Sequence, residues 1–219
     1  MIILYIIKKC KSIKYEIFIE IDINIIYNEN MNIYDFDNTI YDGESLFDFF
    51  IEYIKVNPVI IRYLPKVLIA FAKYKLGKVT TQQMMENYAP VIRKCYCEYD
   101  KWEEFTTKFW DSHMHKIKSF YKDVQKDDDL ILTASPELTI KEIAKRLGIK
   151  NIVCSKIDDE TGYVTRICMR QNKILALKED FGDVEIDDFY TDSIKNDGFF
   201  AEYAKRVFLV EGDRITQIK

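Results

Sequence analysis

Two aspartates separated by one residue, Asp35 and Asp37, directly follow a short apolar run that ends at Tyr34. A strand that ends here delivers Asp35 to the carboxyl edge of a sheet, where open α/β sheets bind ligands. Side chains two residues apart on a strand point the same way, so two negative charges would lie close together. A cation offsets that cost, and Mg²⁺ is the simplest one for oxygen ligands. A bare Asp-x-Asp is usually a solvated turn, but the preceding strand and Thr39 make this pattern more specific.

A hydroxyl group stands at the end of a second short apolar run, 130–132. Thr133 and Ala134 follow the run, Ser135 fits a helix N-cap, and Pro136 fits a first helical turn. A strand-end hydroxyl beside the free N–H groups of a helix start makes a good phosphate cradle. The pattern predicts phosphate binding at Thr133, and for Ser135 it predicts only a capping role.

Two more charged positions occur farther along the chain. Lys173 lies near the start of an amphipathic segment, and Lys178 follows later in the same segment. A further apolar run, 189–191, ends in Asp192, and Asp197 comes five residues later. Most lysines are plain surface residues, so Lys173 gains importance only from its place among the other pieces.

Together, these residues resemble the four motifs of the haloacid dehalogenase superfamily, in its phosphoserine-phosphatase-like branch. The resemblance implies that Asp35 is a nucleophile that forms an aspartyl-phosphate and that Asp37 is the general acid/base. It also implies that Thr133 and Ala134 bind phosphate. Lys173 would neutralise the phosphoryl oxygens and hold Asp35 ionised, with Lys178 as the alternative. The resemblance covers Met31 to the C-terminus, but only its motifs are specific.

The same resemblance implies a Mg²⁺ site. Asp192 would complete it with Asp35 and the backbone carbonyl of Asp37, and Asp197 would support Lys173 or a metal-bound water. Phosphoserine phosphatases keep their second acid one residue closer to the strand. Asn196 occupies that position here, so the roles of Asn196 and Asp197 could be shifted by one residue.

The expected function is that of a Mg²⁺-dependent phosphomonoesterase acting on a small phosphorylated metabolite. Glu44 lies where phosphoserine phosphatases place a glutamate that binds the substrate's amino group, although a helix dipole favours a carboxylate there equally well. Those enzymes also need a cap arginine for the substrate carboxylate. An alignment at Gly77 puts Glu86 there, which argues against phosphoserine, although Arg62 or Arg93 could replace that arginine.

Two alternative functions share most of these motifs. A phosphotransferase would use the same intermediate and let an alcohol replace water. A non-catalytic regulatory protein would keep the fold but typically lose an essential residue. The chain retains Asp35, Asp37, Lys173 and Asp192, which favours an enzyme.

The predicted fold class is α/β, a Rossmann-like three-layer core with a parallel sheet and an inserted helical-bundle cap. Residues 31–43 and 126–219 form the predicted core, and 44–125 form the predicted cap. Apolar spacing in the cap indicates four helices. Ser45 could cap the first of them, and Pro90 should end or kink the third.

Residues 1–30 precede the first motif. Between positions 15 and 25, isoleucines alternate with mostly polar residues, a period that indicates a strand. The segment is either an extra edge strand or hairpin, or an extension before a natural start at Met31, because members of the family usually begin just before this motif. We favour the second interpretation and assign the segment no chemistry.

Composition limits the partners and the location. The chain has 219 residues and a net charge of −4, which does not suggest a nucleic-acid partner. Its five cysteines are odd in number and lack Cys-x-x-Cys spacing, which favours reduced thiols in a cytoplasmic protein. No apolar run reaches the roughly 18 residues that a membrane span needs. We therefore predict a small phosphate ester as the partner and no membrane, and the oligomeric state stays open.

Overall fold

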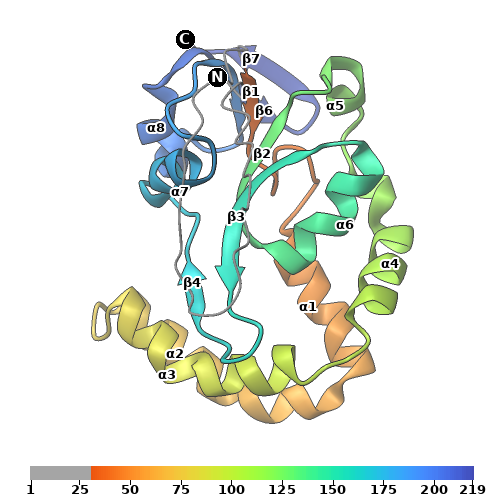
Figure 1. The fold of residues 1–219 in the computed structure, drawn as a ribbon, viewed down its shortest axis with the longest axis vertical. Coiled ribbons are helices and arrows are strands. Elements are labelled where there is room, and N and C mark those ends of the chain that lie inside the picture. Colours follow the sequence, from red (N-terminus) through yellow and green to blue (C-terminus); the bar gives the residue numbers. More distant parts are fainter. Residues whose placement is uncertain (1–30) are drawn as a thin grey trace, which may run out of the picture.

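Strand β1, which carries the first motif at its end, lies in the middle of a seven-stranded sheet. The computed structural model describes residues 31–219, so the predicted extension 1–30 lies outside the described residues. The strand order is β4-β3-β2-β1-β5-β6-β7, with five parallel inner strands and antiparallel pairing of β4 and β7 at the two edges (Figure 1). The strands are β1 (Met31–Tyr34), β2 (Leu130–Pro136), β3 (Asn151–Ile157), β4 (Val164–Arg166), β5 (Ile186–Thr191), β6 (Ala204–Glu211) and β7 (Arg214–Gln217).

Helices cover both faces of this sheet and form the outer two of three layers. Helices α7 (Asn172–Phe181) and α8 (Ile194–Ala201) pack on one face, and α6 (Glu137–Leu147) packs on the other. Neighbouring strand residues enter opposite layers because side chains alternate, so Leu130 packs toward α7 while Ile131 packs toward α6. The predicted Rossmann-like α/β core is confirmed, with a sheet that is mixed at its edges.

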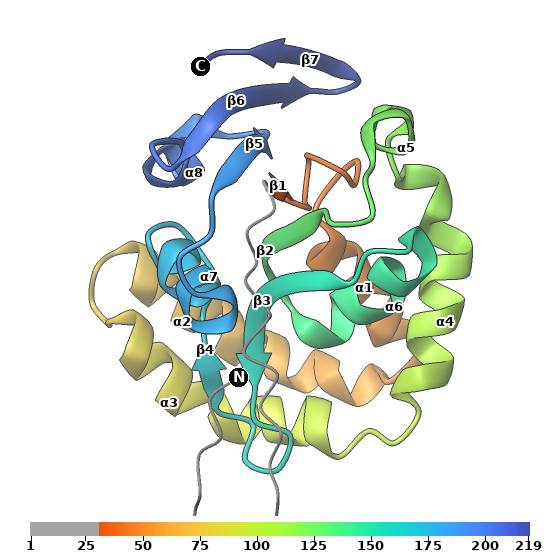
Figure 2. The same cartoon turned by 45° about the horizontal axis from the view of Figure 1, so that its top comes forward.

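The segment between β1 and β2 is helical, as predicted. Two of its helices, α1 (Ser45–Val56) and α4 (Trp102–His113), contact α6 of the core. Helices α2 (Leu64–Lys75) and α3 (Thr81–Ile92) pack against each other at the end of the molecule away from β7 (Figures 1 and 2). Shorter helices complete the segment: η1 (Pro58–Tyr63), η2 (Arg93–Cys97), η3 (Met114–Lys116) and α5 (Ser119–Val124). No helix in the described residues is long and apolar enough to cross a membrane.

Pro90 does not end the third helix. It lies inside α3, which continues to Ile92 and then widens into the π-helical turn η2. The hairpin between the antiparallel strands β3 and β4 reaches this turn. A Cβ on Gly162, at the tip of the hairpin, would lie 2.5 Å from the backbone nitrogen of Arg93. The hairpin and the cap backbone therefore meet at a point where only glycine fits.

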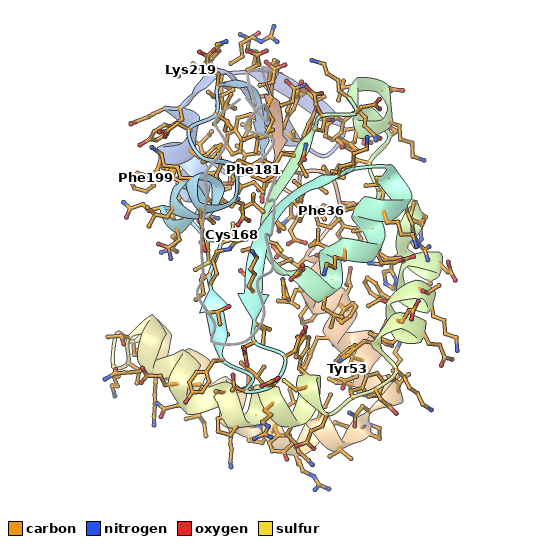
Figure 3. The ribbon with its side chains drawn as sticks, in the orientation of Figure 1. Phe36, Tyr53, Cys168, Phe181, Phe199 and Lys219 are labelled. Atoms are coloured by element: carbon orange, nitrogen blue, oxygen red, sulfur yellow. The ribbon has the colours of Figure 1, made fainter. Side chains whose placement is uncertain are left out.

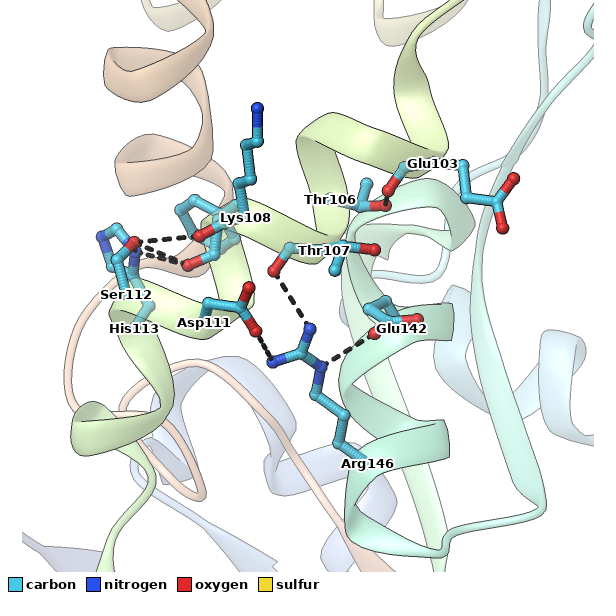
Figure 4. A network of polar contacts seen from close by, with 10 residues as sticks. Glu103, Thr106, Thr107, Lys108, Asp111, Ser112, His113, Glu142 and Arg146 are labelled. Atoms are coloured by element: carbon cyan, nitrogen blue, oxygen red, sulfur yellow. Dashed lines mark hydrogen bonds and ion pairs between the residues drawn. The ribbon is translucent and has the colours of Figure 1, made fainter.

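Arg146 links the cap segment to the core. Its guanidinium, on α6, pairs with Asp111 of α4 at 2.8 Å and donates to the carbonyl of Thr107 at 3.0 Å (Figure 4). Glu142, one turn earlier on α6, holds the Nε of Arg146 at 2.8 Å. Because the guanidinium presents its donors in a rigid fork, these contacts fix α4 against α6.

Buried aromatic side chains from α1 and from the turn before it belong to one hydrophobic cluster. Phe36 lies near α6, and Tyr53 lies toward the far end of α1 (Figure 3). The Tyr53 hydroxyl donates to the carbonyl of Cys95 in η2, and its ring packs on that of Trp102 at a centroid distance of 4.5 Å. These contacts anchor α1, whose first residue, Ser45, contacts Asp37.

Candidate active site

Most of the residues singled out from the sequence surround one cleft of about 290 Å³ at the carboxyl edge of the sheet. The backbone nitrogen of Asp35 donates to the carbonyl of Tyr190 at 2.9 Å, which prolongs the β1–β5 pairing up to this residue. The cleft is lined by Asp35, Asp37, Asn38, Glu44, Ala134, Met169, Arg170, Lys173, Asp192, Asn196 and Asp197.

A buried lysine joins two of these carboxylates. The Nζ of Lys173, on α7, lies 2.9 Å from Asp35 Oδ1 and 3.0 Å from Asp197 Oδ1. Asp197, in the first turn of α8, also accepts from the hydroxyl of Thr191 at 2.9 Å. Only 3% of Lys173 is exposed, so its ammonium is buried between the two acids that it contacts. Lys178 instead pairs with Asp183 on the surface, which leaves Lys173 as the lysine of the cleft.

The cleft carries more negative charge than this lysine offsets. Burial raises the pKa of Asp35 to about 7. Lys173 opposes this shift, whereas the nearby carboxylates of Asp197 and Asp37 add to it. Burial and Asp197 also raise the pKa of Asp192, which Lys173 again opposes. Burial alone would lower the pKa of Lys173, but Asp35 and Asp197 raise it above its ordinary value. The raised pKa of Lys173 favours its charged form, and Asp35 and Asp197 share this one countercharge.

Asp37 is held separately, by the start of α1 and by a serine. Its Oδ1 accepts from the backbone nitrogen of Ser45 at 2.6 Å, and its Oδ2 accepts from the hydroxyl of Ser135 at 2.8 Å. The positive φ of Asn38, 60°, turns the chain sharply after the aspartate. Helix N-termini attract carboxylates through their free N–H groups, so α1 fixes the side chain of Asp37.

The predicted capping roles of the two serines are wrong. Glu44 is the N-cap residue of α1 and Pro136 that of α6, and neither makes a side-chain capping bond. Both serines contact Asp37 instead. The sequence could not predict the contact of Ser135, because this residue lies 98 residues from Asp37 in the chain.

Thr133 and Ala134 occupy different positions at the end of β2. Thr133 is fully buried, accepts from the backbone nitrogen of Ser135 at 3.1 Å and does not line the cleft. Ala134 lines the cleft, and its carbonyl accepts from the hydroxyl of Ser155 at 2.7 Å. Ala134 therefore lines the cleft, whereas the Thr133 hydroxyl that the sequence favoured does not.

Of the residues considered for substrate recognition, Glu44 and Asn196 line the cleft. Glu44 accepts from the side-chain amide of Asn38 at 2.8 Å. Neither Arg62 nor Arg93 is part of the lining. The lining cation that sequence reasoning missed is Arg170, which adopts a left-handed φ of 53°. Such a conformation is uncommon away from glycine and is enriched at functional sites.

The donor set suits a magnesium ion that also binds water and phosphate. Within residues 31–219 no group of three or more acidic, histidine or cysteine side chains is arranged to hold a metal ion by itself. Mg²⁺ commonly takes only one or two carboxylates and fills its other positions with water and substrate oxygens. Asp35 and Asp192 are the candidate carboxylates, because both line the cleft and both carry raised pKa values. The excess of acids over cations in the cleft fits such an ion.

Comparisons with known proteins agree with the fold. A family model described as haloacid dehalogenase-like hydrolase matches residues 33–197. A structure of a protein of unknown function from Bordetella pertussis Tohama I shares 16% identity at a TM-score of 0.64, covering 82% of this chain and 89% of that one. No curated protein matches the chain.

Two further similar structures carry phosphoserine phosphatase names. A phosphoserine phosphohydrolase-like protein from Francisella tularensis subsp. tularensis SCHU S4 shares 17% identity at a TM-score of 0.49, covering 82% of this chain and 85% of that one. A phospho-aspartyl intermediate analogue of phosphoserine phosphatase shares 13% identity at a TM-score of 0.41, with the same two coverages.

Proposed function

Because the chain belongs to the haloacid dehalogenase-like hydrolases, we propose that it is a Mg²⁺-dependent phosphomonoesterase acting through an aspartyl-phosphate on Asp35. The observation that carries the proposal is the contact of Lys173 with both Asp35 and Asp197 at the carboxyl edge of the sheet. A structural ion pair needs one acid, whereas a lysine shared by two acids beside further carboxylates suits the binding of a phosphoryl group. The small phosphate ester proposed as substrate remains of unknown identity.

The two carboxylates of the first motif have different surroundings, which supports different roles. Oδ1 of Asp35 is held by Lys173, and no described residue hydrogen-bonds its Oδ2, so that oxygen is free for in-line attack on phosphorus. Asp37 is oriented through both of its oxygens by Ser45 and Ser135. We assign to Asp37 the proton delivered to the leaving oxygen and the proton later taken from water.

Charge on the transferred group would be met by Lys173 and by backbone N–H groups near Ala134. Asp35, Asp192 and the carbonyl of Asp37 would hold Mg²⁺, with Asp197 placed to support Lys173. When bound, the metal would supply charge neutralisation of the phosphoryl oxygens. Asn196 and Glu44, at the rim of the cleft, would contact the rest of the substrate.

The test is hydrolysis of p-nitrophenyl phosphate with Mg²⁺ and then with EDTA, on the wild type and on Asp35→Asn. We expect turnover that needs Mg²⁺ and falls by about 10³-fold or more in the variant, as for the loss of other nucleophiles. The melting temperature should not fall, because the amide removes a crowded charge. Turnover that survives Asp35→Asn would contradict the nucleophile assignment.

Two follow-up measurements separate the remaining alternatives. Adding an acceptor alcohol tests for a phosphotransferase, which would yield a new phosphorylated product. Mg²⁺-dependent binding of beryllofluoride, a mimic of the aspartyl-phosphate, tests the site when no substrate turns over. Absence of both turnover and beryllofluoride binding would favour a non-catalytic regulatory protein.

A further inference from the structure

Helix α2 exposes an unusual amount of apolar surface. Three consecutive side chains, Val67, Leu68 and Ile69, are 40%, 65% and 55% exposed. Successive helical residues are about 100° apart, so these three span most of the helix circumference. Ala70, at 5% exposure, marks the narrow line along which α2 packs. The helix therefore presents a broad apolar face to its surroundings.

The same region is purely cationic. Between positions 56 and 85 the sequence holds five lysines and arginines and no aspartate or glutamate, in a chain with a net charge of −4. Arg62, Lys66, Lys73 and Lys78 are exposed, and none of them forms an ion pair with a described residue.

Cations on the flanking helices behave differently. On α1, Lys55 pairs with Glu52 at 2.6 Å, and on α4, Lys108 pairs with Glu104 at 2.6 Å. Such i,i+3 and i,i+4 pairs are the usual arrangement on a solvated helix. The absence of acids is therefore specific to α2 and the residues around it in the chain, 56–85, and ends at Glu86 on α3. The exposed apolar surface and the unbalanced positive charge coincide on this one stretch.

We propose that this cap face, comprising Val67, Leu68 and Ile69 with Lys66 and Lys73, docks on the surface of an anionic lipid bilayer. An interfacial helix needs no spanning segment, because apolar side chains enter the headgroup boundary while lysines contact anionic lipids. Only such a partner uses both properties of the face. The proposal revises the prediction of no membrane partner and does not depend on the proposed reaction.

Other occupants fit less well. In a symmetric dimer the face would meet itself, so unpaired cations would be brought against like charges. A nucleic acid would satisfy the lysines through its phosphates but would leave the apolar side chains without a partner. A bilayer that contains anionic lipids satisfies both sets at once.

The experiment is co-sedimentation of the full chain with vesicles of phosphatidylcholine alone or mixed with phosphatidylglycerol. We expect binding to the mixed vesicles that weakens with salt and little binding to phosphatidylcholine. Lys66→Gln with Lys73→Gln should weaken binding by roughly fivefold per charge. Leu68→Ser with Ile69→Ser should weaken it at least tenfold, because two exposed apolar side chains leave the interface.

Matched variants test whether the effect belongs to this face. Lys108→Gln removes an exposed but paired cation, and Leu175→Ser removes a side chain that is 66% exposed on α7. Neither should change vesicle binding, and every variant should keep its circular dichroism spectrum and its turnover of p-nitrophenyl phosphate. If turnover and beryllofluoride binding are both absent in the wild type, the proposed function fails while the vesicle assay still decides the docking.

Three outcomes would overturn the docking proposal. Full-length protein that ignores anionic vesicles at low salt would contradict it, whether residues 1–30 or another partner covers the face. Equal loss of binding in the matched variants would show general electrostatic adsorption. A dimer in equilibrium sedimentation that Leu68→Ser with Ile69→Ser dissociates would assign the face to a second copy of the chain.

Discussion

Each end of the central sheet holds an aspartate that is largely shielded from solvent, and the two have very different surroundings. At the carboxyl edge, Asp35 shares the cleft with further acids and is contacted by the buried ammonium of Lys173. At the opposite end, Asp129 precedes β2 and accepts from the Tyr121 hydroxyl at 3.3 Å and the backbone nitrogen of Lys126 at 2.9 Å. Burial raises the pKa of Asp129 to about 6.

The difference in surroundings distinguishes an aspartate in a candidate active site from one whose burial only costs stability. Both carboxyls are raised in pKa by burial, but Asp35 is raised further by neighbouring acids although a lysine opposes them. A bound cation would relieve that crowding, and carboxyls with such raised pKa values are typical of functional sites. Asp129 has no charged partner and a buried Oδ1 without a hydrogen bond among the described residues. It only lowers stability.

Replacing the lysine should have the largest effect on this contrast. Lys173→Met leaves Asp35 and Asp197 buried without a countercharge, which typically costs about 3–5 kcal/mol of unfolding free energy. Turnover should fall by about 10²–10³-fold through the lost electrostatic stabilisation. Urea unfolding without metal and hydrolysis assays measure the two losses.

Lys178→Met is the matched control, since that lysine pairs with Asp183 on the surface. It should change stability by less than about 1 kcal/mol. Equal effects of the two substitutions would remove the distinction between the shared lysine and an ordinary surface pair.

Asp129→Asn should produce the next largest effect, and in the opposite direction. The pKa of Asp129 is higher in the folded chain than in the unfolded one, so the folded state binds more protons between about pH 4 and 6. Wild-type stability therefore carries a term that falls as pH rises through this window. The amide removes that term, so the stability of the variant relative to the wild type should be about 1–3 kcal/mol more favourable at pH 7 than at pH 4.

Unfolding of the wild type and Asp129→Asn across pH 4–7 measures this gain. Asp127→Asn, at an exposed position of the same loop, serves as the control and should follow the wild type. Turnover should be unaffected by either change. A variant whose stability tracks the wild type at every pH would show that Asp129 ionises normally.

Of the two aspartates, Asp35 and Asp129, the sequence pointed only to Asp35. Motif spacing identified Asp35, Asp37 and Asp192 because strand ends in a parallel sheet converge on one edge, and each of them lines the cleft. The α/β core and the inserted helices followed from the periodicity of apolar residues. No sequence pattern marked Asp129, since its burial depends on packing by α5, where Tyr121 contacts it.

Contacts between segments that are far apart in the chain could not be predicted from motif spacing either. Ser135 reaches Asp37 because β2 lies beside β1 in the sheet and α1 begins above both ends. Arg170 enters the cleft through a left-handed backbone conformation that its residue type does not suggest. Local rules describe capping and strand ends, whereas these contacts depend on the register of strands far apart in the chain.

Ser135→Ala should have the smallest effect, and it tests that distant contact. Loss of the hydroxyl removes one hydrogen bond to a carboxylate, worth about 1.5 kcal/mol, so kcat should fall by about tenfold with little change in stability. Because Asp37 is proposed to move protons, the pH profile of kcat should shift as well. A serine that merely fills space would leave that profile unchanged.

Thr139 provides the comparison that makes this test sharp. It lies on α6 one turn after Pro136, is fully buried, and its hydroxyl has no hydrogen-bond partner among the described residues. Thr139→Val should therefore leave kcat and its pH profile intact and should stabilise the fold slightly, since an unpaired buried hydroxyl is lost. If both substitutions reduce kcat alike, the effect comes from packing of α6. A tenfold fall of kcat in Ser135→Ala alone would show that the effect comes from the orientation of Asp37 at the carboxyl edge of the sheet.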